Sequence, residues 1–453
     1  MKQILVLGAG KSSPYLISYL LEQAEKNDWY VTVADMDLEL AKRRIGDSTR
    51  GSAIRFDVNN SEMRSSQIQK SDVVVNMLAP RFQHVVALTC VRMGKHMVSV
   101  SYEDIRMRDL SRDAERKGVL MLTEIGLDPG IDHMSAAQLI HKIREKGGVI
   151  KSFESYGGGL PAPDTLSNPF KYVISWNPRN VVMAGENGAQ YLEKGKIKII
   201  PWHNVFQNTW PLEVPGIGMM EAYPNRDSLS YRERYGFKDA DTVIRGTIRY
   251  PGWCETWMQI QRLGLPNEKM RIPNLKERTF AELTEMFLPL SVGTQTSIEK
   301  RVPRFLNINP TGQIMEKMRW LGLFSEEKIG LDVETSAEVL THILADKLRL
   351  RDDARDMVIL LHRLVAEYPK ENNRQEEIVS TMLHYGEKAG FTSMAKSVGL
   401  PAALIVKLLL QEQLSLVGCH IPTHPMIYNP LMKELEEEGF QFNEQVNEIT
   451  KGS

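Results

Sequence analysis

The N-terminal stretch Ile4-Leu5-Val6-Leu7-Gly8-Ala9-Gly10-Lys11-Ser12-Ser13 decides the fold class of this chain. Its apolar residues predict a buried strand, its two glycines a tight turn, and the pattern that follows a helix. This order is typical of a loop that binds the pyrophosphate of a dinucleotide, because Gly10 lets the ligand approach the backbone and the helix N-terminus attracts negative charge. Ser13 takes the usual place of a third glycine and is still small enough for close helix packing. An ordinary strand-to-helix turn is the alternative interpretation.

The second predicted strand supports the dinucleotide interpretation. Val31-Thr32-Val33-Ala34 ends at Asp35, the distance expected for the acid that binds the adenosine ribose hydroxyls. A carboxylate there repels a 2′-phosphate, and Met36 and Asp37 follow it rather than an arginine, so we expect NAD in preference to NADP. Asp57 and the segment 76–80 are expected walls for adenine and nicotinamide, although Asp57 could equally cap a helix.

Short β-rich runs alternate with amphipathic helical patterns through the first third of the chain. This alternation predicts a doubly wound, Rossmann-type parallel sheet. The predicted strands are 4–7, 30–34, 53–56, 73–76, 97–100 and 119–122.

The sequence texture predicts three domains in all. We expect a dinucleotide-binding domain over 1–132, with the C-terminal helical region 391–453 packing back on it. An α/β substrate or dimerisation domain is expected over 133–253 and 354–390, where 357–368 and 377–385 read as a β-hairpin. Residues 254–353 show apolar spacings of three and four, which predict an all-helical domain.

Composition favours a folded protein that acts on small molecules. The chain has 453 residues, 56 basic against 57 acidic, so no broad basic surface for nucleic acid or an anionic membrane is expected. No apolar run reaches the roughly 18 residues that a membrane span needs, so none is expected. Three widely spaced cysteines, Cys90, Cys254 and Cys419, suit a reducing cytoplasm and predict neither disulfides nor a metal site.

The run Glu124-Ile125-Gly126-Leu127-Asp128-Pro129-Gly130-Ile131-Asp132-His133 brings carboxylates and an imidazole to the carboxyl end of a predicted strand. Open α/β sheets bind their ligands at that edge. A plain strand-to-helix connection with Asp132 as the helix N-cap is the alternative.

Three further clusters combine turn residues with hydrogen-bonding side chains: 99–102, 156–163, and 223–228 followed by 245–250. We expect them to furnish a polar, cationic pocket. Arg226 and Arg249 carry most information, because guanidinium groups bind carboxylates in pairs of hydrogen bonds, which suggests a substrate with several carboxyl groups. Alternatively, these arginines are solvated or paired with Asp227 and Glu221.

With these clusters, the chain resembles the saccharopine dehydrogenases of the L-glutamate-forming type and the dehydrogenase half of animal aminoadipic semialdehyde synthase. The resemblance covers nearly the whole length. It also rests on 168–169, 175–176, 320–324, 355–358 and 394–401. Gly157 is a departure, because relatives carry cysteine there, and relatives that use NADP carry Cys-Arg where this chain has Asp35.

The resemblance implies a set of site residues. Tyr102 and Asp128 would be catalytic, and the base could be Asp128, Tyr102, His133 or water. Saccharopine contacts would be Ser101, Tyr102, Asp128, Arg226, Thr247, Ile248 and Arg249. Cofactor contacts would be Gly8, Gly10, Lys11, Ser12, Ser13, Asp35, Asp57, Met77, Leu78, Val100, Leu127, Asp128 and Pro129.

The implied reaction oxidises saccharopine with NAD, or possibly NADP, and releases L-glutamate and 2-aminoadipate 6-semialdehyde. A homodimer is possible. Two alternatives remain at this point: a related reductive-condensation enzyme such as a carboxynorspermidine dehydrogenase, whose polyamine substrate would call for carboxylates in the pocket, and a nucleotide-binding regulator without activity.

Overall fold

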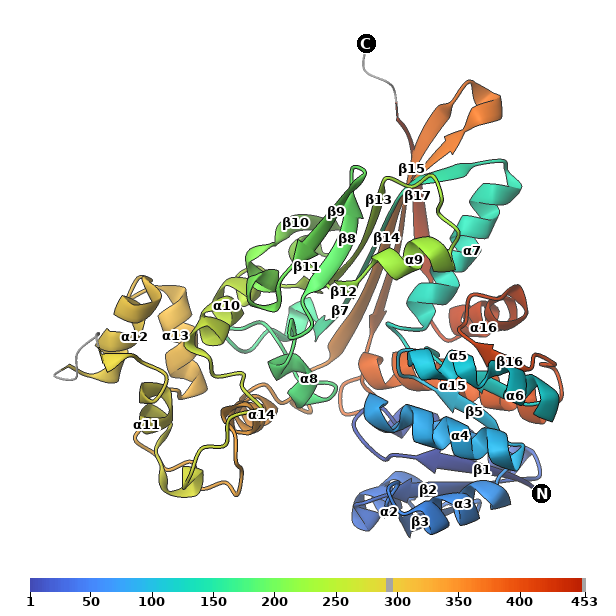
Figure 1. The fold of residues 1–453 in the computed structure, drawn as a ribbon, viewed down its shortest axis with the longest axis horizontal. Helices are drawn as coiled ribbons and strands as arrows, with labels where there is room; N and C mark the ends of the chain where they lie inside the picture. Colours follow the sequence, from blue (N-terminus) through green and yellow to red (C-terminus); the bar gives the residue numbers. More distant parts are fainter. Residues whose placement is uncertain (291–295, 450–453) are drawn as a thin grey trace. The chain divides into compact units, whose positions relative to one another are not determined.

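The structure is a computed structural model that describes residues 1–290 and 296–449 (Figure 1). The chain forms two compact units. Unit 1 comprises residues 1–148 and 382–443, and unit 2 comprises residues 149–381 together with the C-terminal segment from Glu444. The expected break at residue 132 therefore lies sixteen residues before the division at Gly148, since helix α7 (Ile131–Glu145) belongs to unit 1.

Unit 1 contains the predicted parallel sheet, with strand order β16-β6-β5-β4-β1-β2-β3. All its neighbouring strands pair in parallel. The strands are β1 (Lys2–Leu7), β2 (Trp29–Asp35), β3 (Gly51–Arg55), β4 (Val73–Asn76), β5 (His96–Ser99), β6 (Leu120–Leu122) and β16 (Gly418–His420). The connecting helices are α1 (Pro14–Lys26), α2 (Leu38–Ile45), α3 (Ser61–Lys70), α4 (Gln83–Met93), α5 (Ile105–Asp109) and α6 (Ser111–Lys117). The doubly wound prediction is confirmed.

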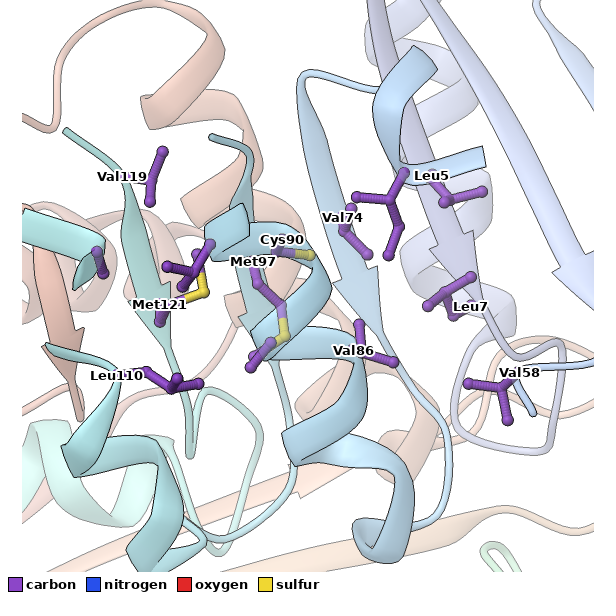
Figure 2. Packing of buried hydrophobic residues seen from close by; sticks show 14 of the residues in the cluster. Leu5, Leu7, Val58, Val74, Val86, Cys90, Met97, Leu110, Val119 and Met121 are labelled. Atoms are coloured by element: carbon purple, nitrogen blue, oxygen red, sulfur yellow. The ribbon is translucent and has the colours of Figure 1, made fainter. Parts of the chain in front are cut away.

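The core of unit 1 explains why these strands read as continuous apolar runs. Figure 2 shows Leu5, Leu7 and Val74 of the sheet together with Val86 and Cys90 of α4, and all of these side chains are buried. The alternate residues of β1 are buried as well. A parallel sheet covered on both faces needs apolar side chains at every position, rather than at every second one.

Helix α15 (Ser393–Leu410) returns to unit 1 and packs against α1, β4 and β5. Gly399 allows the close approach, because a Cβ atom there would lie 2.8 Å from the backbone nitrogen of Leu16. Contrary to our expectation about apolar runs, α15 is long and apolar enough to span a membrane by composition, but 83% of its apolar window is buried, as in a core helix. Helix α16 (Pro425–Glu437) follows it.

The C-terminal strand departs from the expectation for 391–453. Strand β17 (Phe442–Ile449) does not join the unit 1 sheet but takes the end position of the second sheet, beside β15. The backbone N–H and C=O groups of a strand need hydrogen-bonding partners, and the edge of β15 supplies them. This pairing, rather than closeness in sequence to unit 1, decides where β17 lies.

Unit 2 is built on a sheet in which β10-β11-β13-β7-β14-β15-β17 are successive neighbours. Strand β8 pairs with β13, and β9 and β12 pair with β8. Its long strands are β7 (Val149–Pro161), β14 (Asp356–Tyr368) and β15 (Arg374–Tyr385), and the last two are the predicted hairpin. The shorter strands are β8 (Ala189–Glu193), β9 (Lys196–Ile200), β10 (Trp210–Val214), β11 (Gly218–Pro224), β12 (Arg226–Asp227) and β13 (Thr242–Arg249).

The glycine cluster 156–159 lies inside strand β7 rather than in the turn that we expected. The neighbouring strand explains its small residues. A Cβ atom on Gly158 would lie 3.1 Å from the Ile248 carbonyl oxygen of β13, and one on Gly246 would lie 2.6 Å from the Tyr156 ring. These glycines therefore serve close packing of β7 and β13.

The expected helical segment is present within unit 2. Its helices are α10 (Trp253–Leu263), α11 (Phe280–Glu285), α12 (Ile298–Leu306), α13 (Gln313–Leu321) and α14 (Ser336–Lys347). Two short helices, α8 (Pro178–Val182) and α9 (Leu229–Arg234), lie among the strands. Short 3-10 turns occur at 80–82, 163–165, 202–207, 275–277 and 369–371.

Candidate functional site

The glycine loop has the geometry that the dinucleotide prediction requires. Gly8 has φ +104°, and a Cβ atom there would lie 3.2 Å from the Met77 carbonyl oxygen, so a side chain is excluded on two grounds. A Cβ atom on Gly10 would meet no heavy atom within 4 Å. Space for a ligand is thus left in front of the loop. The buried Ser13 hydroxyl donates to the Gly10 carbonyl at 2.9 Å and holds the loop against α1.

Asp35 lies at the end of β2 and contacts this loop directly. One carboxylate oxygen accepts from the Ala9 backbone nitrogen at 2.7 Å, and the other accepts from the Asp37 backbone nitrogen at 2.9 Å. Asp37 in turn caps α2, accepting from the Leu40 nitrogen. The Arg44 Nε of α2 donates to the Ala9 carbonyl at 3.1 Å. The sequence did not indicate this arginine, because a helix turn brings it to the loop.

The other predicted cofactor residues follow successive strands of the same sheet. Asp57 follows β3 and accepts from the Asn59 backbone nitrogen at 2.9 Å, whereas Asn60 caps α3. Asp57 is therefore not the helix cap that we considered. Further along the sheet edge lie Met77 and Leu78 after β4, Val100 after β5 and Leu127 to Pro129 after β6. Because parallel strands end at the same edge, the structure brings these residues and the glycine loop to one rim of unit 1.

Tyr102 and Asp128 come together at this rim. The Tyr102 hydroxyl donates to Asp128 Oδ1 at 3.2 Å. Asp128 is only half-buried, although most of its neighbours from Met121 to Gly130 are buried. Ser101, next to Tyr102, is half-buried too. The structure therefore presents a carboxylate and a phenol side by side, with partial access to solvent.

Asp132 is not the helix N-cap of the alternative interpretation. Gly130 occupies that position with φ +151°, and Asp132 lies in the first turn of α7. Its Oδ1 accepts from the Gly130 backbone nitrogen at 2.6 Å. The carboxylate closes the turn that carries Asp128.

In unit 2, Arg249 is a buried cation enclosed by aromatic rings. Its side chain lies 5.0 Å from the Tyr172 ring centroid and 4.9 Å from that of Trp253, and only 4% of the residue is exposed. One terminal nitrogen donates to the Ile248 carbonyl at 2.9 Å and the other to the Tyr223 hydroxyl at 3.3 Å. Burial raises the pKa of Tyr223 to about 12, although the Arg249 charge opposes this shift.

Arg249 has no carboxylate within ion-pair distance among residues 1–290 and 296–449, and its buried Nε has no hydrogen-bond partner. Glu221, the partner that we considered, instead accepts from the backbone nitrogens of Cys254, at 2.7 Å, and Gly252, at 3.3 Å, at the start of α10. Lys317 donates to the Gly252 carbonyl at 2.7 Å. Glu221 therefore holds the start of α10, the helix that carries Trp253, and does not form an ion pair with Arg249.

The remaining predicted substrate residues of unit 2 differ in accessibility. Arg226 is exposed in β12, with φ +55°, and pairs with Ala189 of β8. The Asp227 carboxylate accepts hydrogen bonds from the Gln190 side chain and from the Leu229 backbone nitrogen at the start of α9. Thr247 is half-buried, and the Ile248 side chain is fully buried. The aromatic walls Tyr172 and Trp253 were missed, because only folding brings them to Arg249.

Within the described part of the chain, no group of three or more His, Cys, Asp and Glu residues is arranged to hold a metal ion. Cys90, Cys254 and Cys419 are all unpaired. Burial raises the pKa of the Cys90 thiol.

Comparison with known proteins gives matches over almost the entire chain. The family model described as the saccharopine dehydrogenase NADP binding domain matches residues 4–122, and the saccharopine dehydrogenase C-terminal domain matches residues 126–440. The NADP(+), L-glutamate-forming saccharopine dehydrogenase of Pyricularia oryzae is 33% identical, over 98% of this chain and 99% of the relative. The enzyme of the same name from Schizosaccharomyces pombe is 32% identical with the same coverage.

A solved structure is similar over the full length. The apo saccharopine dehydrogenase (L-Glu forming) of Saccharomyces cerevisiae matches with a TM-score of 0.86 and 30% identity, covering 99% of this chain and 100% of the other.

Proposed function

Because this chain belongs to the saccharopine dehydrogenase family, we propose that it catalyses the reversible conversion of saccharopine, NAD(P)⁺ and water to L-glutamate, 2-aminoadipate 6-semialdehyde and NAD(P)H. The reaction is a step of lysine metabolism. The observation that carries the proposal is the Tyr102–Asp128 contact on the same sheet edge as the Gly8–Ser13 loop. The groups that we propose for cofactor binding and for proton transfer thus share one rim, as a dehydrogenase requires.

The residues present fit a nicotinamide dinucleotide. Open space at Gly10, the start of α1 behind it and the Asp35 carboxylate suit a pyrophosphate and a ribose. Asp57, Met77, Leu78, Val100 and Leu127 to Pro129 would line the rest of the cofactor. When bound, the nicotinamide supplies the hydride acceptor of the reaction.

We propose NAD as the preferred cofactor, and NADP as a weaker one. The proposal rests on Asp35 and on the second carboxylate at Asp37, because both would repel a 2′-phosphate. The fungal relatives are named for NADP(+), so the ratio of kcat/KM for the two cofactors is the measurement that decides. Arg44, which contacts Ala9, is the basic group that could favour a phosphate.

Tyr102 and Asp128 are proposed to act on the secondary amine of the substrate. That amine must lose a proton before its neighbouring carbon can be oxidised, and a half-buried carboxylate next to a phenol can accept the proton or hold the ammonium form. Ser101 would place a further hydroxyl beside them. His133 is fully buried and its Nε2 lies 2.7 Å from Glu124 Oε2, so it is the weakest candidate for a base among those considered.

Arg249 and Arg226 are proposed to bind carboxylates of saccharopine. A guanidinium group has five N–H donors, and the structure uses two of those of Arg249. Burying a cation that has no ion-paired carboxylate among the described residues is costly, and a substrate carboxylate would supply that partner. Arg226 is exposed on β12, and Thr247 and the Ile248 backbone lie beside Arg249 on β13.

The test is to mix the purified protein with saccharopine and NAD and to follow the ultraviolet absorbance of NADH. Asp128→Asn, which keeps the size of the side chain, should lower kcat at least tenfold, as is typical for loss of an acid–base group. NADH formation with a carboxynorspermidine instead would favour the related dehydrogenase. Nucleotide binding without turnover of either compound would indicate a regulator.

We also propose that the protein is cytoplasmic and forms a homodimer. Three unpaired cysteines suit the cytoplasm, and fractionation of the source cells tests this. A homodimer is tested by light scattering of the purified protein, in which a monomer mass of 51.5 kDa would contradict it.

A further inference from the structure

Glu124 and His133 form a buried side-chain pair in the same segment as Asp128. Glu124 Oε2 lies 2.7 Å from His133 Nε2, and the two residues are 1% and 0% exposed. Neither residue reaches the solvent-accessible rim. A buried pair of this kind is weak evidence for stability, because desolvation of both groups offsets their attraction. Its position therefore needs another explanation.

The other oxygen of the same carboxylate holds the segment that carries Tyr102. Glu124 Oε1 accepts from the Glu103 backbone nitrogen at 2.8 Å. The Glu124 backbone nitrogen donates to the Ser101 carbonyl at 3.0 Å. Tyr102 is thus flanked on both sides by contacts with one residue. Glu124 itself has φ +58°, a conformation that non-glycine residues adopt rarely and at a cost.

The histidine end of the pair holds the segment that carries Asp128. His133 lies in the first turn of α7. That turn is bonded to the loop before it, because the nitrogens of Ile131 and Asp132 donate to the carbonyls of Gly126, at 2.9 Å, and Leu127, at 3.0 Å. The loop that carries Asp128 is therefore tied to the first turn of α7, and His133 links that turn to Glu124.

We propose that Glu124, held by His133, is a positioning residue that sets the distance between the Tyr102 hydroxyl and the Asp128 carboxylate. One carboxylate links the two segments, with one oxygen directed to each. A buried carboxylate that bridges two segments fixes the distance between them better than two surface contacts would. Neither of its oxygens can exchange its partner for water. The expected loss of kcat rests on the proposed function, whereas the expected change in the Tyr102–Asp128 distance does not.

The test compares Glu124→Ala with Glu124→Gln, alone and combined with Tyr102→Phe. Glutamine keeps an acceptor for the Glu103 nitrogen and a hydrogen-bonding group for His133, whereas alanine loses both. We expect Glu124→Ala to lower kcat by about tenfold or more with the KM for NAD changed less than about threefold, and Glu124→Gln to restore most of kcat. If Glu124 acts through Tyr102, the Glu124→Ala/Tyr102→Phe variant should be no slower than the slower single variant.

His96→Ala is the matched control. This histidine is half-buried in unit 1, and its Nδ1 accepts from the Leu120 nitrogen at 3.0 Å. It lies at the start of β5 rather than at its carboxyl end. His96→Ala should lower the thermal midpoint of unfolding. Its effect on kcat should multiply with that of Tyr102→Phe in the double variant. Multiplicative losses for Glu124→Ala as well, or a kcat close to wild type, would overturn the proposal.

Two further readouts keep the outcomes separate. If Glu124→Ala does not fold, His133→Gln combined with Tyr102→Phe carries the same cycle. A crystal structure of the variant decides the geometry without turnover: the Tyr102 hydroxyl should leave Asp128, and an unchanged contact contradicts the proposal. Absence of NADH formation by the wild type would instead refute the proposed function.

Discussion

Replacement of Arg249 by methionine separates a substrate-binding role from a structural one. Methionine matches the length of the arginine side chain approximately and can pack among the aromatic rings of Tyr172 and Trp253. It removes the charge and every N–H donor. The two roles predict opposite effects on stability and activity.

The structural cost of Arg249→Met is small. Two hydrogen bonds are lost, to the Ile248 carbonyl at 2.9 Å and to the Tyr223 hydroxyl at 3.3 Å, which together contribute about 1–3 kcal/mol. Against this, the variant no longer desolvates a cation that has no ion-paired carboxylate in the described residues, which offsets part of that loss. The free energy of unfolding should therefore change by less than about 2 kcal/mol.

The functional cost is larger. A charge-assisted hydrogen bond to a substrate carboxylate contributes about 1.5–3 kcal/mol. Its loss corresponds to about a 10- to 150-fold lower kcat/KM for saccharopine. The KM for NAD should stay within about threefold of wild type, because only the substrate contact changes. Steady-state kinetics and urea-induced unfolding measure the two effects on the same preparations.

Arg301→Met is the matched control. Arg301 is also a buried arginine of unit 2, but it is ion-paired with Glu285. Breaking that pair should lower the free energy of unfolding while kcat/KM stays near wild type. The reasoning is refuted if Arg249→Met shows the pattern expected of Arg301→Met, with lost stability and intact turnover of saccharopine.

Three further predictions follow from single contacts. Asp35→Asn keeps an acceptor for the Ala9 nitrogen but removes the charge, so the ratio of kcat/KM for NADP to that for NAD should rise about tenfold; an unchanged ratio would remove Asp35 as the determinant. Gly399→Ala would place Cβ 2.8 Å from the Leu16 nitrogen and should destabilise the protein by about 1–3 kcal/mol in urea, whereas a stabilised variant would show that helix propensity dominates. Burial, and secondarily the charge of Lys396, lower the pKa of His384 from 6.5 to about 4. Its stability contribution is complete above pH 6.5 and is lost as the pH falls towards 4, by up to about 3 kcal/mol; His384→Gln should flatten this part of the stability curve, and an unaltered slope would contradict the assignment.

The first sheet was predictable because its signal is local. Strands β1 and β4 each contain an unbroken apolar run, 4–7 and 73–75, and Gly8 and Asp35 lie directly at strand ends. Parallel strands must end at one edge, so the sequence also placed Tyr102 and Asp128 near the glycine loop. Strand ends shifted by one or two residues, as at β6, because burial and turns rather than propensity end a strand.

What the sequence determined by itself was therefore the parallel fold, the dinucleotide loop and the family, all of which depend on short patterns and residue identity. Tertiary structure decided the contacts between residues far apart in the chain. It enclosed Arg249 with Tyr172 and Trp253, brought Arg44 to the Ala9 carbonyl, and moved β17 to the second sheet. It also changed the meaning of the glycines near residue 157, which serve strand packing rather than a turn. Spacing along a chain specifies turns and periodic faces, whereas the partner of a buried charge is set only when distant segments pack and exclude water.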